Sequence, residues 1–236
     1  MIIVRMRRYF QAVLIVFFSL SIIGFIWITS GVLRFPYAVD YGEAPLVDQA
    51  NRLLNHQAIY RADFSTPPYV IANYPPIYPL FVAGLSHLTR IPPLLSGRII
   101  SLTAALASAG ILASLAESLV GRRWACLAAM GLFLGHPYVI SWSVLARVDS
   151  LALFFCLAAL LVLYHRWRSW AWLTLALGLL LAAIYTRQSY LLAGPVAAIS
   201  WLWSRDRRRA GAFAILLFVL VTLSFLLINW QTQDGF

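Results

Sequence analysis

The acidic residues of this chain are few and unevenly placed. Three of its eight Asp and Glu residues, Asp40, Glu43 and Asp48, lie in the stretch YAVDYGEAPLVDQ at residues 37–49. Asp40 and Glu43 are three residues apart, so one helical turn would bring them to the same side. A carboxylate within hydrogen-bond reach of a hydroxyl can accept its proton. The pair therefore predicts a base, with the second acid holding a metal or sugar hydroxyls; the alternative is two solvated loop acids.

Basic residues recur where apolar segments begin or end. Arg98 opens one such segment, Arg147 and Asp149 lie between two others, and Arg187 follows a fourth. Ionisable groups at membrane depth are costly, so they tend to pair and to mark functional sites. Because Arg binds phosphate through two parallel hydrogen bonds, this pattern predicts a lipid-phosphate site. Two alternatives remain open: a structural Arg147–Asp149 pair, and simple headgroup anchors at Arg98 and Arg187.

The composition is that of an integral membrane protein. Of 236 residues, 62% are hydrophobic and 11% are charged, whereas soluble domains have roughly 45–50% and 25%. The formal net charge is +10, and all 18 basic residues are Arg. They punctuate apolar segments, which is typical of topology signals and contacts with membrane lipids and excludes nucleic acid as the expected partner. The two cysteines lie in apolar segments, so no disulfide framework is expected.

Hydropathy predicts an all-α, polytopic membrane protein with a single membrane domain over residues 1–236. A first span at residues 10–33 follows three arginines and lacks the cleavage site of a signal peptide. Six further spans are expected within residues 99–230, at Ile99–Val120, Trp124–Trp142, Ser150–Tyr164, Trp170–Thr186, Ser189–Trp203 and Ala210–Trp230. The segment Ile77–Leu88 is apolar but about 12 residues long, which is too short to cross.

The arginines decide the predicted orientation. If Ile77–Leu88 does not cross, eleven arginines, including the run at Arg205–Arg209, lie inside with the N-terminus and seven lie outside; a crossing would reverse this. We therefore expect seven spans, with the N-terminus inside and the C-terminus outside. Residues 34–98 then form one external loop with two flat interfacial helices, at 46–57 and 77–88.

Several short motifs occur in a characteristic order along the chain. They are DYGE, YPPIYPLFVAG, GRIISLTAALASAGILASLAESLVGRR, ARVDSLALFFCLAALLVLY and TRQSYLLAGP. This order resembles the GT-C fold membrane glycosyltransferases, in particular the bacterial branch similar to protein O-mannosyltransferases and aminoarabinose transferases. The resemblance covers nearly the whole chain. The resemblance rests more on the order of the motifs and on the predicted topology than on any single motif.

The resemblance implies roles for individual residues. Asp40 matches the catalytic Asp of the family's first external loop, and Glu43 takes the companion acidic place, although the spacing is D-x-x-E where the family has adjacent acids. Tyr74 precedes the two prolines, where the family often has a basic residue or His, and we assign it an organising role. Further matches are Arg98 and Arg187, with Arg147, for the donor phosphate, and Asp149 for organising the site.

The implied reaction is inverting sugar transfer from a polyprenyl-phosphate donor at the external face of the plasma (inner) membrane. No cofactor is implied with certainty, the use of a divalent metal is open, and so is the oligomeric state. Related enzymes continue with further helices, so we expect a C-terminal portion beyond this chain. Two other classes stay open: a transporter or lipid flippase, whose charges would line a path through the membrane, and a non-catalytic membrane module.

Overall fold

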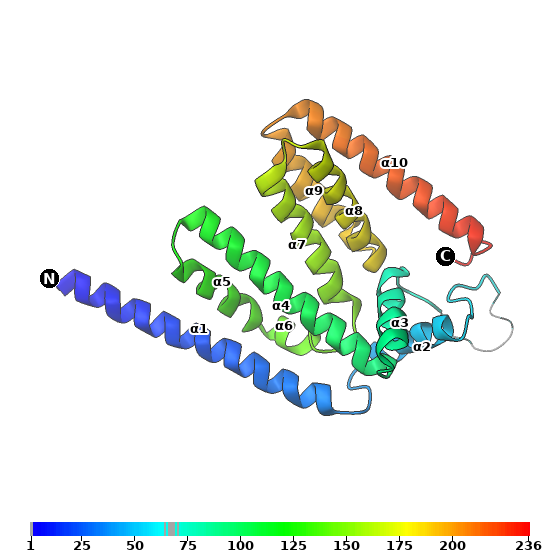
Figure 1. Cartoon of the computed structure of the whole chain (residues 1–236), viewed down its shortest axis with the longest axis horizontal. Coiled ribbons are helices and arrows are strands. Elements are labelled where there is room, and N and C mark those ends of the chain that lie inside the picture. Colours follow the sequence, from blue (N-terminus) through cyan, green and yellow to red (C-terminus); the bar gives the residue numbers. More distant parts are fainter. Residues whose placement is uncertain (1, 64, 66–68, 70) are drawn as a thin grey trace.

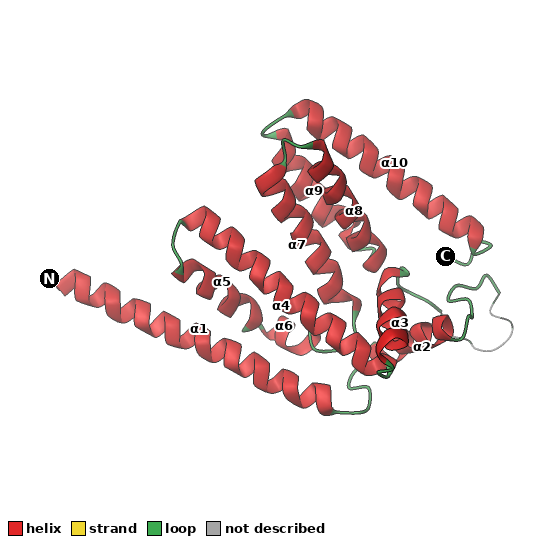
Figure 2. Cartoon of the chain, viewed as in Figure 1, coloured by secondary structure: helices red, strands yellow, loops and turns green. Residues whose placement is uncertain are grey.

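The computed structural model describes residues 2–63, 65, 69 and 71–236, and every regular element in that part is a helix (Figure 2). The prediction of an all-α protein is confirmed. The described residues form ten helices: α1 (Ile2–Arg34), α2 (Glu43–Leu54), α3 (Ile77–Thr89), α4 (Pro93–Val120), α5 (Trp124–Leu134), α6 (Pro137–Trp142), α7 (Val148–Arg166), α8 (Trp170–Thr186), α9 (Tyr190–Trp203) and α10 (Arg207–Gln231).

Among the described residues, four helices are long and apolar enough to cross a membrane. They are α1 from Gln11 onward, α4, α7 and α10. Large apolar side chains on them face outward: Trp27, Phe218 and Trp230 are each more than 70% exposed. Exposed apolar surfaces of this size are typical of helices that face hydrocarbon, so the described helices are consistent with the membrane protein predicted from composition. Three shorter apolar helices, α5, α8 and α9, pack beside the four, and α3 is the fourth apolar helix of 10–17 residues in the described part of the chain.

The span expected at 124–142 is not one continuous helix but is divided into two. Helix α5 ends at Leu134, and a new helix, α6, begins at Pro137. Pro137 cannot continue α5, because its ring lacks an N–H and clashes with the preceding turn. His136 takes an extended conformation between the two helices, and its Nδ1 accepts a hydrogen bond from the Tyr138 N–H. The break turns α6 toward the start of α7.

The two short helices after α1 lie close to their predicted positions. Helix α3 spans the predicted 77–88 and one residue more, and it ends where Arg90 adopts a left-handed conformation with φ 62°. Helix α2 begins and ends three residues before the predicted 46–57. His56, with φ 56°, ends the helical path there.

The helices are arranged so that their ends alternate between two levels (Figure 1). The C-terminal ends of α1 and α10 and the N-terminal ends of α4 and α7 lie at the level of α2 and α3. The opposite ends carry the loops that contain Arg122, Arg166 and the Arg205–Arg209 run. Separate apolar cores join α7 to α8, α9 and α10, and join α2 and α3 to α4 and α7. Acidic and basic loop segments are thus brought together beside α2.

Candidate functional site

A fully buried ion pair joins the start of α2 to α4. The guanidinium of Arg98 donates from Nε and Nη2 to the two carboxylate oxygens of Glu43, each at 2.9 Å. Its other three N–H groups donate to backbone carbonyls at the end of α1, namely Val32, Phe35 and Tyr37, at 2.6–2.8 Å. Arg98 is 1% exposed and Glu43 is 0% exposed. All five donors of the guanidinium are therefore occupied.

The carboxylate of Glu43 is saturated as well. Besides Arg98, it accepts hydrogen bonds from the Ala146 N–H at 2.8 Å and from the Val39 N–H at 2.7 Å. A carboxylate has about four acceptor positions, and four hydrogen bonds fill them. Neither side chain has capacity for a ligand. The roles predicted from the sequence, a catalytic Glu43 and a phosphate-binding Arg98, thus find no support in this geometry.

Two opposing effects set the protonation of Glu43. Burial, the largest single effect, raises its pKa, whereas the hydrogen bonds from Arg98, Ala146 and Val39 and the charge of Arg98 lower it. The net result is a pKa below the ordinary value of 4.5. Glu43 is therefore ionised at neutral pH and holds the ends of α1, α2 and α4 to the segment before α7.

A second, partly exposed group of charges lies next to this pair. Arg147 Nη1 is 2.5 Å from Asp40 Oδ2, and Arg147 Nε is 3.3 Å from Asp149 Oδ2. The other oxygen of Asp149 contacts Arg187 Nη1. The four side chains form a line of alternating sign, Asp40–Arg147–Asp149–Arg187, which we call the ion chain. Sequence reasoning had selected all four residues, and the structure brings them together.

Local backbone features position the ion chain. A Cβ on Gly42 would overlap the guanidinium of Arg147 and lie 2.9 Å from Asp40 Oδ2, so a side chain at this position would separate the two. The carbonyl of Arg147 accepts a hydrogen bond at 3.0 Å from Ser101, which also bonds Tyr78. Glu43 accepts a hydrogen bond from the N–H of Ala146, the residue before Arg147. The buried Glu43–Arg98 pair therefore positions the backbone of Arg147 next to Asp40.

The ends of the ion chain retain unused hydrogen-bonding groups. Asp40 uses Oδ2 for both Arg147 and the Gly42 N–H, and Oδ1 has no hydrogen-bond partner among the described residues. Arg187 is 32% exposed, and its interaction with Asp149 uses one nitrogen. An acceptor atom at one end and free guanidinium donors at the other could therefore engage a polar ligand.

A cavity of about 150 Å³ adjoins the Asp149–Arg187 end of the ion chain. Aromatic residues contribute much of its lining, including Tyr138, Trp142 and Tyr190. Tyr138 donates a hydrogen bond to Asp149 Oδ1 at 3.2 Å, and Arg147 stacks 4.1 Å over the Trp142 ring. Sequence analysis did not single out Tyr138 or Trp142, because their helix, α6, was expected to continue α5. Gly42 was equally missed, although its place between Asp40 and Glu43 is a signal.

Tyr74 does not join the ion chain. Its carbonyl accepts a hydrogen bond from Tyr60 at 2.8 Å, and its side chain packs against the apolar core of α2 and α3. It lines a different cavity, of about 460 Å³, beside α8 and α10. In the described part of the chain, no three His, Cys, Asp or Glu side chains are grouped so as to hold a metal ion.

Comparison with known proteins gives no relative for this chain. No family model, curated protein or solved structure matches it. The class of protein that the observations define is thus a helical membrane protein with an ion-paired site beside α2.

Proposed function

We propose that this chain carries the catalytic module of an inverting glycosyltransferase that uses a polyprenyl-phosphate sugar. The supporting observation is the ion chain: a carboxylate with one unused oxygen and a partly exposed guanidinium lie at its two ends. Direct displacement at a sugar carbon needs one base for the incoming hydroxyl and cationic donors for the departing phosphate. The ion chain contains both within one continuous set of contacts.

In the proposed step, the acceptor hydroxyl oxygen forms a bond to the anomeric carbon from the face opposite the phosphate. The bond between that carbon and the phosphate oxygen breaks, and its electron pair leaves with the polyprenyl phosphate. The hydroxyl proton passes to Asp40 Oδ1. A single displacement inverts the configuration of the anomeric carbon, and no covalent enzyme intermediate forms.

The cationic roles fall to Arg187 and Arg147. Arg187 adjoins the cavity beside Asp149 and has unused donors, so it contacts the phosphate directly. Arg147 orients Asp40 and offsets charge that develops on the leaving group. Glu43 and Arg98 act as positioning residues, because their hydrogen bonds are already used within the protein.

We further propose seven crossings, formed by α1, α4, α5 with α6, α7, α8, α9 and α10, with α2 and α3 lying flat at the outer surface. Arginines gather at the level opposite α2 and stack on tryptophans: Arg205 lies 4.1 Å from the ring of Trp201, and Arg209 lies 5.5 Å from that of Trp170. Arg-rich loops favour the cytoplasmic side, and Trp favours the membrane interface. The ion chain then faces outward from the plasma membrane.

The position of the charges favours an enzyme over a transporter. In the described part of α4, the charged residues are Arg98 near one end and Glu117 near the other. In α7 they are Asp149 in the first turn and His165 and Arg166 in the last. A transport path would place ionisable groups near the middle of such helices.

Sugar transfer from a radiolabelled polyprenyl-phosphate hexose to extracted membrane acceptors tests the proposal, with the full-length protein in liposomes. Asp40→Asn removes the base and is expected to lower kcat by roughly 100-fold or more. Arg187→Gln is expected to raise KM and lower kcat, because phosphate binding strengthens in the transition state.

Asp63→Asn is the matched control for Asp40→Asn. Asp63 is a loop acid that accepts hydrogen bonds from the backbone N–H and the hydroxyl of Ser65, and it lies outside the ion chain. Its substitution is expected to leave transfer unchanged. If Asp40→Asn and Asp63→Asn transfer sugar equally well, the assignment of Asp40 is wrong.

A further inference from the structure

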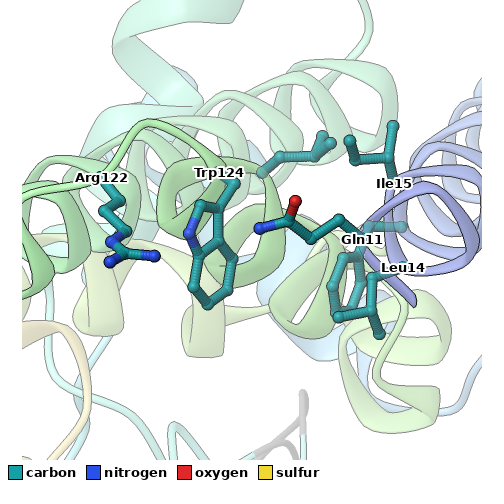
Figure 3. A pocket seen from close by; sticks show the side chains of 7 residues that line it. Gln11, Leu14, Ile15, Arg122 and Trp124 are labelled. Atoms are coloured by element: carbon teal, nitrogen blue, oxygen red, sulfur yellow. The ribbon is translucent and has the colours of Figure 1, made fainter. Parts of the chain in front are cut away.

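A further groove, of about 310 Å³, lies between α1 and α5 (Figure 3). The N-terminal ends of these two helices lie at the opposite level from α2 and the ion chain (Figure 1). Its inner wall is apolar and consists of Leu14, Ile15, Phe18 and Leu127. Its rim is polar. Figure 3 shows the side chains of Arg122, Trp124 and Gln11 following one another along the groove.

The groove exists because two parallel helices touch at one end and diverge toward the other. Gly131 of α5 lets Phe18 of α1 approach so closely that a Cβ would lie 2.7 Å from the Phe18 ring. One turn further along, a Cβ on Gly135 would lie 2.8 Å from Ser21 Cβ. Small residues allow such close contact between membrane helices. Toward Gln11 and Trp124 the larger side chains hold the helices apart.

With α1 crossing the membrane as proposed, the polar rim lies at the depth of lipid headgroups. Gln11 is the first residue of the apolar stretch of α1, and Arg122 lies between the end of α4 and the start of α5. Phe18 is seven residues beyond Gln11, which is about 10 Å deeper along a helix. A groove with a cationic rim and an apolar inner wall at this depth matches the shape of one phospholipid. The phosphate would lie at the rim and the acyl chain along the apolar wall.

The positive charge of the rim favours a lipid with an anionic headgroup. Arg122 and Arg123 are exposed, and no acidic side chain forms a salt bridge with Arg122 in the described residues. The acid in this region is Glu117, one turn before the end of α4. The positive charge therefore remains in excess, and anionic headgroups are attracted to such interfacial arginines.

We infer that this groove binds one anionic phospholipid. Its acyl chain lies along Leu14, Ile15 and Leu127, and its phosphate accepts hydrogen bonds from Arg122 and from the Trp124 indole N–H. The inference stands on the α1–α5 geometry and does not depend on the proposed sugar transfer. The acyl chain fills the space between α1 and α5 at the end where the two helices diverge.

Native mass spectrometry of the delipidated protein tests this site, with phosphatidylglycerol and phosphatidylcholine of identical acyl chains added in equal amounts. The wild-type protein is expected to retain phosphatidylglycerol preferentially. Arg122→Gln should reduce retained phosphatidylglycerol roughly fivefold, because one interfacial arginine contributes on the order of 1 kcal/mol toward anionic lipid. Leu127→Trp fills the space along the apolar wall and should reduce retention of both lipids.

The control is Arg123→Gln, which removes the same charge from a neighbouring residue that does not line the groove. It should retain phosphatidylglycerol as the wild type does. Equal losses in Arg122→Gln and Arg123→Gln indicate diffuse attraction and overturn the inference. So does unchanged retention in Leu127→Trp, or displacement of the lipid by inorganic phosphate, which has no acyl chain.

Discussion

Glu43 and Arg98 are 55 residues apart in the sequence, yet each uses its whole hydrogen-bonding capacity with the other and with nearby backbone groups. Because the Glu43 carboxylate also accepts from Ala146 N–H, it holds the residue next to Arg147. Asp40, one turn before Glu43, thereby meets Arg147 at a fixed distance. The buried pair therefore positions the residues of the ion chain and does not itself contact a ligand.

Glu43→Gln is expected to destabilise the protein by about 3–5 kcal/mol, because it leaves the Arg98 charge buried without a carboxylate. The midpoint of thermal unfolding in detergent measures the effect. Glu117→Gln is a suitable control, because it removes an exposed acid from the helix that carries Arg98. That change is expected to stay within about 0.5 kcal/mol. Similar losses in both variants would contradict the structural role of the pair.

Stability should also depend on pH through Glu43. Its pKa in the folded protein lies below 4.5, so the unfolded chain takes up the proton more readily. The contribution of the ion pair is therefore complete above pH 4.5 and is lost as the pH falls through the lowered folded value. Unfolding midpoints recorded from pH 7 to pH 3 should fall more steeply for the wild type than for Glu43→Gln. Parallel curves would rule out this linkage.

Gly42→Ala is expected to reduce sugar transfer about tenfold or more, since small displacements of catalytic groups are costly. The backbone of Gly42, with φ −77°, suits any residue, so the effect would come from the overlap of the new methyl group with Arg147. Gly84→Ala provides the comparison, because a Cβ at Gly84 meets no atom within 4 Å. Transfer assays and unfolding midpoints of both variants would separate loss of activity from loss of fold.

The sequence predicts much of the helical framework because hydrophobic content and helix length are local properties. Helix α3 was located to within one residue, and α1, α4, α7 and α10 correspond to predicted spans. The break between α5 and α6 was not predicted. Its signal, Gly135-His136-Pro137, is a strong local interruption inside a segment whose average hydropathy remains that of a span.

The sequence predicts which residues belong to the site better than it predicts which of them contact each other. Placement at helix ends selects Asp40, Arg147, Asp149 and Arg187, and the structure joins them. No local pattern shows that Arg98 faces the carbonyls at the end of α1, because that contact depends on how α1, α2 and α4 converge. Tyr74 illustrates the converse: its neighbouring prolines suggested a site residue, but the turn directs it to another cavity.

The sidedness of the two levels is open to direct measurement by cysteine labelling in sealed membrane vesicles. The native cysteines Cys126 and Cys156 are first replaced by Ala or Ser. Ala62→Cys then probes the level of α2, and Arg208→Cys probes the start of α10. With arginine-rich loops inside, a membrane-impermeant maleimide added from the external side should label Ala62→Cys and not Arg208→Cys.

The same experiment bears on the chemistry, because the donor phosphate and Asp40 must meet on one side of the membrane. Opening the vesicles should make Arg208→Cys reactive, which controls for a buried thiol. The reverse labelling pattern would place the ion chain on the cytoplasmic side and contradict external sugar transfer. The proposed topology places five crossings between residues 62 and 208, namely α4, α5 with α6, α7, α8 and α9. An odd number puts the two positions on opposite sides of the membrane. Labelling of both positions from one side would require an even number and would contradict this topology.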